Sequence, residues 1–420
     1  MRMIAIDLGT SNCSVAVLED GQNPQVVPLE FGDVDSYTPM VMPSAVCVCQ
    51  ALQCVGASTT FGHEALRHTF SLDHDSTLLQ EMKIYFDRAT ASAPTMVESG
   101  EGYSLREEHG FLSPVRTTYL QPRWEGNVPL QPKDFVPGTA KLVKELVRKA
   151  TSGGTDRNAI VAGYPASFGG IGIRRLREAV TLGAFGQSDN YDGVRLYPEP
   201  LAAARAYMGI QAGNFLVLDY GGGTLDITVM NLPNGTEFKV ENASVSGFPE
   251  AGSRIDEAIL TYCLHRAGEP LQKWYGDQKT RTKLRIKANV EAAKISLSVA
   301  AEATVEFTGS EFDPVRLTAE DISYAVQSIM MRMGAKVMEA TLRHLGAIEK
   351  VQYVVLSGGT CLSPVVQDSI LALFQHIPHD RFIVPSASKQ EDVETCLCAV
   401  SKGLALLASE GYSAPPIPTA

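Results

Sequence analysis

Residues 214 to 230 limit the possible folds more than any other part of the sequence. They read Asn-Phe-Leu-Val-Leu-Asp-Tyr-Gly-Gly-Gly-Thr-Leu-Asp-Ile-Thr-Val-Met. The apolar run before Asp219 predicts a buried strand, the glycines predict a tight turn, and Ile227 to Met230 predicts a second strand. Three successive glycines are unfavourable in regular structure, so we expect a second group to approach the backbone of this turn closely.

The chemistry expected of this turn is phosphate binding. The backbone N–H groups of residues 221–224 can form a cradle for phosphate oxygens. Asp219 and Asp226 flank the turn and can hold a metal ion, directly or through water. Mg²⁺ fits best, because it keeps most of its waters and binds beside phosphates. The alternative is an ordinary glycine-rich hairpin with two solvated aspartates.

The N-terminus repeats this pattern half a chain earlier. Met3 to Asp7 predicts a strand, Cys13 to Leu18 predicts its partner, and the turn between them contains Gly9, Thr10, Ser11 and Asn12. Later in each half, a further apolar strand leads into a proline or glycine turn, at 159–165 and at 353–360. The sequence therefore indicates a duplication at domain scale, with two similar lobes facing each other across a nucleotide cleft.

Composition narrows the class of protein. The 420 residues are long enough for two sizeable domains, and 45% hydrophobic with 20% charged residues is typical of globular proteins. A net charge of −11 without a basic block argues against nucleic-acid binding. No apolar run approaches the roughly 18 residues of a membrane span, and the N-terminus enters a strand at once, so we expect neither a membrane anchor nor a signal peptide. Eight cysteines without a disulfide-type framework favour a cytoplasmic location.

Four blocks of sequence carry a resemblance to a known family. Asp7 to Asn12, Tyr197 to Ala203, Asp219 to Asp226 and Ser357 to Thr360 resemble the phosphate and connecting motifs of an actin-like ATPase. They are most similar to the nucleotide-binding domain of the DnaK-type heat-shock chaperones, particularly the divergent YegD-like group. The resemblance covers almost the whole chain, in order. It implies an α/β fold with ribonuclease-H-like duplicated lobes, and ATP or ADP with Mg²⁺ as cofactors.

The resemblance also implies a division of the chain. Residues 1–212 are expected to form the first lobe and 213–410 the second, with a helical subdomain at about 252–317 and a flexible tail at 411–420. Prolines crowd residues 93–137, which excludes long helices and central strands there. We expect a loop-rich insertion in the small part of the first lobe. Full chaperones continue into a peptide-binding β-sandwich, and we expect this chain to lack it.

The resemblance assigns roles around the phosphates. It implies that three aspartates organise metal and water, that Lys83 orients the attacking water, and that Glu199 reaches the magnesium shell. Two simpler interpretations remain open: Lys83 is a solvated helical lysine, or Glu199 serves only as a favourable charge in the first turn of a helix. The catalytic set expected here is Asp7, Lys83, Glu199, Asp219, Thr224 and Asp226, with Asp7, Asp219 and Asp226 as the metal residues.

A second set is expected around the nucleoside. Glu291, Lys294 and Ser298 are spaced by three and four residues, which places them on one face of a helix. The helix opening at Gly252 offers backbone amides to a phosphate or ribose oxygen. The resemblance adds Gly358 and Gly359 to the nucleotide site. It also shows three departures, Ile295, Leu362 and Leu397, where the family has polar or stacking groups, so we expect a more apolar base pocket.

Two helices are predicted with defined ends. Thr318 to Leu345 is expected to form a long helix capped by Thr318, with acidic residues in its first turn. Val393 to Leu407 is expected to form the last helix.

Three functions fit these observations. The first is a chaperone-like, magnesium-dependent ATPase with slow hydrolysis. The second is an interaction module that binds nucleotide, hardly hydrolyses it and signals by lobe closure. The third is a small-molecule kinase of the same fold, for which no substrate base is identifiable. A Walker-type site is excluded, because no Gly-Lys pair occurs. The expected partners are nucleotide and a protein partner or co-chaperone, without nucleic acid or membrane.

Overall fold

The structure is a computed structural model that describes most of the chain. It describes residues 2–29, 39–49, 59–62, 64–65, 76–79, 83, 86, 105–108, 111–114, 135–151, 159–187, 193–207, 212–232, 243–248, 250–278 and 280–412. Most of the expected insertion at 93–137 and of the expected tail at 411–420 therefore lies outside the described residues.

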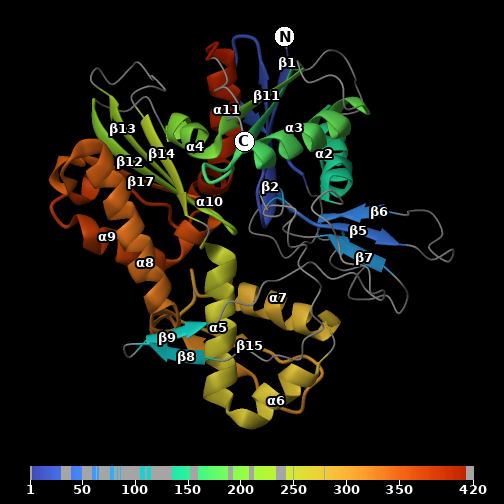
Figure 1. Cartoon of the computed structure of the whole chain (residues 1–420), viewed down its shortest axis with the longest axis vertical. Coiled ribbons are helices and arrows are strands. Elements are labelled where there is room, and N and C mark those ends of the chain that lie inside the picture. Colours follow the sequence, from blue (N-terminus) through green and yellow to red (C-terminus); the bar gives the residue numbers. More distant parts are fainter. Residues whose placement is uncertain are drawn as a thin grey trace.

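Two mixed β-sheets, one from each half of the chain, form the framework (Figure 1). The first has the order β11 (Val194–Pro198), β10 (Ala159–Tyr164), β1 (Arg2–Leu8), β2 (Asn12–Glu19) and β3 (Gln25–Val26), and β4 (Val41–Pro43) also pairs with β2. The second has the order β14 (Ala243–Phe248), β13 (Leu225–Leu232), β12 (Gly213–Tyr220), β17 (Tyr353–Ser357) and β18 (Phe382–Ile383).

The two sheets share one strand plan. In the first, β1 and β2 form an antiparallel hairpin and β10 lies parallel to β1. In the second, β12 and β13 form the hairpin and β17 lies parallel to β12. The strands expected from both repeats are confirmed, and the common plan supports duplicated lobes.

Helices and smaller sheets complete the fold. The helices are α2 (Phe135–Thr151), α3 (Gly170–Phe185), α4 (Glu199–Tyr207), α5 (Gly252–Ala267), α6 (Glu269–Asp277), α7 (Thr280–Ser296), α8 (Ala319–Leu345), α9 (Pro364–Leu371), α10 (Gln390–Leu397) and α11 (Ala399–Ser409). Short 3₁₀ helices are η5 (Ile348–Lys350), η6 (Gly359–Leu362), η7 (Ala372–Phe374) and η8 (His379–Arg381). The small sheets are β6 (Thr59–Phe61), β5 (Val46–Cys49) and β7 (Ser76–Leu79); β8 (Leu105–Glu108) with β9 (Phe111–Pro114); and β15 (Glu302–Val305) with β16 (Val315–Thr318).

The central strands are continuous apolar runs because both faces of each sheet are covered. In β12, Leu216 and Leu218 enter one hydrophobic cluster, with α5 and α8. Their neighbours Phe215 and Val217 enter another, which also holds Met3 and other residues of the first sheet. That second cluster joins the two lobes.

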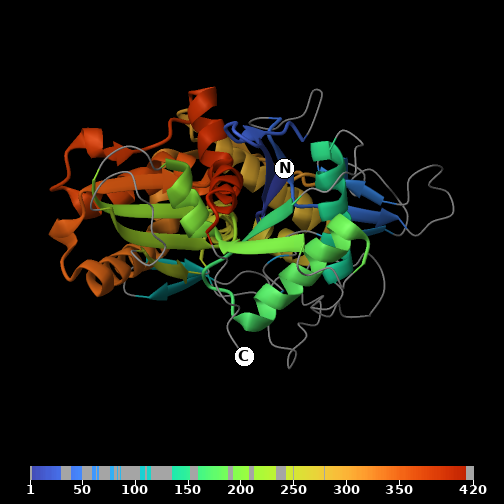
Figure 2. The same cartoon turned by 90° about the horizontal axis from the view of Figure 1, so that it is seen from above.

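Helices α4 and α11 lie side by side in this shared layer, with a sheet on either side (Figure 2). Each packs on the sheet built by the other half of the chain. Helix α4 follows the first sheet but contacts β12 and β13, whereas α11 follows the second sheet but contacts β1, β2 and β10. Their approach requires Gly403, because a Cβ there would collide with the backbone oxygen of Ala202. The lobes are thus joined by two crossing helices.

Three other expectations can be compared with the structure. The cap of α8 is confirmed, since Thr318 and Asp321 form a reciprocal capping box. The single last helix is wrong: it is divided into α10 and α11 at Cys398, whose backbone leaves the helical conformation. The hairpin β8–β9, from the insertion expected in the first lobe, contacts α5 and α8, which belong to the second half of the chain. In the described part of the chain, no helix combines the length and apolarity needed to cross a membrane.

Candidate functional site

A cleft between the two sheets collects the predicted functional residues. The ends of β1 and β12 and the turns that follow them form its walls. The lining residues from the predicted sets are Asp7, Gly9, Thr10, Ser11, Asn12, Lys83, Glu199, Asp219, Gly221, Gly222, Gly223, Thr224, Asp226, Gly252, Glu291, Lys294, Gly358 and Gly359. Among the residues of both predicted sets, Ser298 alone does not line the described cleft.

The two phosphate-type turns contact each other across the cleft. A Cβ added to Gly222 would collide with the side chain of Ser11, and one added to Gly223 would collide with that of Thr10. The glycines are therefore needed for the approach of the lobes themselves. The sequence analysis explained these glycines by the close approach of a phosphate alone. The contact between the two turns is a second reason for them.

The second turn is held from behind by α5 and η6. The amide of Gly221 donates to the carbonyl of Thr224 and closes the turn, N to O 3.0 Å. The amide of Ser253 donates to the carbonyl of Gly222 at 2.7 Å, and that of Gly252 to the carbonyl of Gly221 at 3.1 Å. The sequence predicted that these first amides of α5 bind a phosphate or ribose oxygen. In the structure they donate to the second turn instead.

Three aspartates of the cleft have raised pKa values. Burial, with the nearby charge of Glu199, raises the pKa of Asp7 to about 7, although Lys83 and a hydrogen bond from Ser14 oppose this. Burial and Glu199 raise the pKa of Asp226 to about 7. Burial, followed by the charges of Asp226, Asp7 and Glu199, raises the pKa of Asp219 well above its usual value. The cleft thus concentrates negative charge that a cation would neutralise.

Lys83 is the buried cation of the described cleft. Its ammonium forms an ion pair with the carboxylate of Glu199, and each side chain is only 6% exposed. Burial opposes the charge of Lys83, but the carboxylates of Glu199 and Asp7 outweigh it and raise the pKa of the lysine. The simpler interpretation of Lys83 as a solvated helical lysine is therefore wrong.

Hydrogen bonds from both lobes orient the acidic residues. The carboxylate of Asp226 accepts from the backbone amide of Ala166 in the first half of the chain at 2.9 Å, and from the hydroxyl of Thr224 at 2.9 Å. In the first turn, Ser44 donates to the carbonyl of Gly9 at 2.6 Å. No sequence motif marks Ala166 or Ser44, because both act through contacts distant along the chain.

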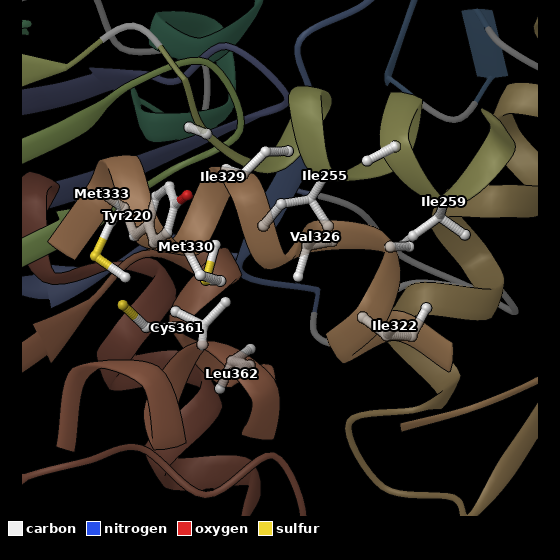
Figure 3. Close-up of a cluster of buried hydrophobic side chains, with 14 of the residues drawn as sticks. Tyr220, Ile255, Ile259, Ile322, Val326, Ile329, Met330, Met333, Cys361 and Leu362 are labelled. Carbon is white, nitrogen blue, oxygen red and sulfur yellow. The ribbon is translucent and has the colours of Figure 1, made fainter. Parts of the chain in front are cut away.

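Helix α7 forms part of the end of the cleft where the sequence predicts the nucleoside. Glu291 and Lys294 line the cleft, and Lys294 forms an ion pair with Asp256 of α5, Nζ to Oδ1 2.7 Å. Ile295 and Leu397 also line it, which gives this end the expected apolar character. Leu362 does not: it is 1% exposed and points into the core beside Cys361, facing α8 (Figure 3).

The donor set suits a hydrated divalent cation beside phosphate oxygens. Four carboxylates, from Asp7, Glu199, Asp219 and Asp226, and the hydroxyls of the two turns surround the same space. In the described ranges, no three His, Cys, Asp or Glu side chains are arranged to ligate one ion directly. A cation that keeps most of its waters, as Mg²⁺ does, fits such carboxylates.

Some lining residues were not in the predicted sets. These are Val41, Thr360, Cys396 and Val400. Thr360 belongs to the Ser-Gly-Gly-Thr block and donates from its hydroxyl to the carbonyl of Gly221 at 2.7 Å, so that block was its signal. The other three are apolar or thiol side chains in ordinary strand and helix sequence, where no local motif marks them.

Comparison with known proteins gives consistent matches. Residues 180–384 match the family model described as Hsp70 protein. The chain is 26% identical over 384 residues to a chaperone protein DnaK of Endomicrobium trichonymphae, covering 87% of this chain and 52% of that protein. It is 27% identical over 398 residues to a DnaK of Thermus thermophilus, covering 90% of this chain and 58% of that protein. A chaperone protein HscA homolog of Methylococcus capsulatus is 27% identical over 389 residues, covering 89% and 55%. The chain spans a little over half the length of these relatives.

Proposed function

We propose that this chain, which has an Hsp70-type nucleotide-binding domain of the actin-like ATPase superfamily, binds ATP or ADP with Mg²⁺ in the cleft and slowly hydrolyses ATP. The observation that carries the proposal is the meeting of both turns, four carboxylates and Lys83 in one cleft. Transfer of a phosphoryl group to water needs mainly positioning and charge neutralisation, which such a set can supply.

Each residue has a defined part in this proposal. The N–H groups and hydroxyls of 9–12 and 221–224 bind phosphate oxygens. Asp7, Asp219 and Asp226 hold a hydrated Mg²⁺, whose charge would neutralise the phosphates. Lys83 donates a hydrogen bond to the attacking water, and its ion pair with Glu199 fixes the ammonium in the cleft. Glu291 and Lys294 contact the nucleoside. Ser298 stays a prediction from helical spacing.

The experiment is thermal unfolding with ATP, ADP and GTP, each with Mg²⁺ or with EDTA. A ligand at about 100 times its dissociation constant stabilises the protein by about 2.7 kcal/mol. We expect a magnesium-dependent rise of the midpoint with ATP and ADP, followed by measurable phosphate release from ATP. An unchanged midpoint with every nucleotide would contradict nucleotide binding.

One observation favours a second function, a nucleotide-gated interaction module. The apolar side chains of Ile295 and Leu397 at the nucleoside end offer no hydrogen bonds to a base. Helices α4 and α11 join the lobes through one core. Closure of the cleft can therefore move surfaces that lie far from it. Magnesium-dependent binding without phosphate release would select this function over hydrolysis.

We further propose a chaperone-type role with a protein partner or co-chaperone, and a cytoplasmic location. The similarity to DnaK and HscA proteins supports the role. The described cysteines, Cys13, Cys263, Cys361, Cys396 and Cys398, are all free and buried, which supports a reducing compartment. Co-purification of a partner that is released by ATP with Mg²⁺, and not by ATP with EDTA, would test the role.

A further inference from the structure

The two ends of the cleft differ in chemistry. The phosphate end has the two turns with their amides and hydroxyls, four carboxylates and Lys83. The nucleoside end is the part that α7, η6 and α10 line, through Glu291, Lys294, Ile295, Gly359, Thr360, Cys396 and Leu397. The side chains of this second end determine which nucleobases the protein can distinguish.

Helix α7 places an apolar side chain in the nucleoside end. Glu291, Lys294 and Ile295 are separated by three and four residues along α7, so they share one face of the helix, and all three line the cleft. The ammonium of Lys294 is held by the carboxylate of Asp256, Nζ to Oδ1 2.7 Å. The side chain of Ile295 has neither a donor nor an acceptor to offer to a base.

Helix α10 places a second apolar side chain there. Leu397 is the last residue of this helix, and its side chain lies against the backbone of Gly359. A Cβ added to that glycine would lie 3.2 Å from a terminal methyl group of the leucine, which is closer than ordinary contact. The absence of a side chain at Gly359 therefore makes room for Leu397, and the leucine covers this part of η6.

Polar groups next to these two side chains are already bonded to the protein. The hydroxyl of Thr360 donates to the carbonyl of Gly221 at 2.7 Å. The thiol of Cys396 donates to the carbonyl of Gly358 at 3.2 Å, and the amide of Gly358 donates to the carbonyl of Cys396, also at 3.2 Å. These donors are directed into the protein, so they do not serve to recognise a base.

We propose that the cleft binds purine nucleoside triphosphates as a class, with Ile295 and Leu397 holding the purine ring without identifying it. The phosphate end and Mg²⁺ would then supply the specificity for a triphosphate. The inference rests on the proposed function and names its substrate class, in which ATP, GTP and ITP are equivalent ligands.

The physical reason lies in what distinguishes the purines. Adenine and guanine share the acceptor N7, but at position 6 adenine carries an amino donor and guanine a carbonyl acceptor. A site that hydrogen-bonds one of these groups rejects the other strongly, because its own buried polar group is then left unpaired. Apolar contact with the flat ring is the same for both bases, so it holds them equally.

The alternative is a site selective for adenine. Glu291 or a backbone carbonyl of the nucleoside end would then accept a hydrogen bond from the amino group at position 6. Such a site would lose affinity when that amino group is replaced by a carbonyl. ITP differs from ATP by this replacement at position 6, so comparing the two nucleotides separates the two interpretations.

The experiment measures competition for the cleft of the full chain by equilibrium dialysis, with labelled ATP and excess Mg²⁺. The competitors are ATP, ITP, GTP, CTP and inorganic tripolyphosphate, which has no base. We expect the dissociation constants of the three purine nucleotides to agree within about threefold. CTP should bind more weakly, because its smaller ring buries less apolar surface, and tripolyphosphate should bind most weakly. A preference of about tenfold or more between ATP and either ITP or GTP overturns the inference while nucleotide binding stands.

Two leucine variants show whether the apolar contact holds the base. Leu397→Ala should weaken ATP, ITP and GTP alike, by about tenfold, and leave tripolyphosphate unchanged. Leu342→Ala is the matched control, because this leucine of α8 is 45% exposed and does not line the cleft. It should change none of the dissociation constants. A loss confined to one purine, or no loss with any of them, in Leu397→Ala overturns the inference.

The failure of this inference can be told apart from the failure of the proposed function. If nucleotides bind no more tightly than tripolyphosphate, the nucleoside end does not hold a base and the inference is overturned, although the phosphate end still binds its ligand. If neither the nucleotides nor tripolyphosphate bind in the presence of Mg²⁺, the proposed function fails together with the inference.

Discussion

At the scale of single residues, the main feature of the cleft is a group of four carboxylates with one lysine among them. Glu199, Asp219 and Asp226 are buried beside the half-buried Asp7, and Lys83 is the cation that the described structure places among them. Burial of like charges is unfavourable, and the raised pKa values of the three aspartates express that cost. Such a cost suits a site that is completed by a cation.

The first prediction concerns Asp219. Asp219→Asn removes one buried negative charge without changing the shape of the side chain. We expect the free energy of unfolding without ligand to rise by about 0.5–2 kcal/mol, because residues of a functional site are often unfavourable for stability. We also expect the magnesium-dependent effect of ATP on the unfolding midpoint to disappear. Asp368→Asn, an exposed change on α9, should alter neither. Survival of the magnesium effect in Asp219→Asn would remove this residue from the metal site.

The second prediction concerns the ion pair of Lys83 and Glu199. Lys83→Met leaves Glu199 as an uncompensated buried charge, so we expect a loss of about 3–5 kcal/mol of unfolding free energy in urea titrations. Lys336→Met breaks a pair with Glu339 in which the side chains are 50% and 47% exposed, and it should cost far less stability than Lys83→Met. Adding Glu199→Gln to Lys83→Met should recover part of the loss. Equal costs for the two lysine variants would show that Lys83 is not buried as described.

At the scale of elements, α8 shows how far local sequence determines structure. Thr318 accepts from the backbone amide of Asp321, and Asp321 accepts from the backbone amide of Thr318. Burial alone raises the pKa of Asp321, but hydrogen bonds from Tyr262 and Thr318 and the charge of Arg266 outweigh it and lower the pKa. The stabilisation that follows is present above the unfolded value of about 3.9 and is lost as pH falls through the lower folded value.

The third prediction follows from this cap. Thr318→Ala should cost about 1 kcal/mol at neutral pH. Asp321→Asn should also destabilise the protein at pH 7, and its difference from the wild type should shrink as the pH is lowered below about 4. Urea titrations at several pH values measure both effects. A difference that stays constant down to pH 3 would contradict a lowered pKa for Asp321.

The fourth prediction tests the crossing of α4 and α11. In Gly403→Ala the new Cβ meets the backbone of Ala202, and we expect a loss of about 1–3 kcal/mol from overpacking. Gly276→Ala in α6 has no neighbouring atom within 4 Å of the new Cβ and should stabilise the protein by about 0.5–1 kcal/mol. Thermal and urea unfolding measure both. If Gly403→Ala also stabilised the protein, the helices would not touch at this point.

The same elements show what could be predicted from the sequence. The strand, Asp, glycine turn and second strand are adjacent along the chain, so both hairpins and most of the cleft were predictable. Ser298 was placed by helical spacing, but α7 ends at Ser296, so the spacing no longer applies there. The break at Cys398 has no glycine or proline to mark it. Ala166 and Ser44 reach the cleft through partners far along the chain, which a local pattern cannot reveal.

At the scale of the whole molecule, two of the contacts between the lobes bear on how the cleft closes. One is the core around α4 and α11, and the other is the contact between the phosphate turns. The first acts as the joint because its helices pack on both sheets. The second lies inside the cleft, where a nucleotide would bind, so the distance between the turns reports how closed the molecule is.

The fifth prediction uses that second contact. In Gly223→Ala the new Cβ would occupy the place of the Thr10 side chain, so the turns must separate and the cleft must open. We expect a larger radius of gyration in small-angle scattering and a weaker effect of ATP with Mg²⁺ on the unfolding midpoint. Gly221→Ala is the matched control, because its nearest neighbour, the carbonyl oxygen of Thr224, lies 3.6 Å from the new Cβ. It should leave the scattering profile unchanged.

Removal of the opposing side chain separates steric opening from damage to the turn itself. Thr10→Gly in the Gly223→Ala background makes room for the new methyl group, so the radius of gyration should return to the wild-type value even if phosphate binding stays weakened by the loss of Thr10. A variant that remains expanded after this second change would show that Gly223 is required by its own turn. A Gly223→Ala protein as compact as the wild type would show that the two turns do not contact each other in solution, and the glycines would then be explained by the phosphate alone.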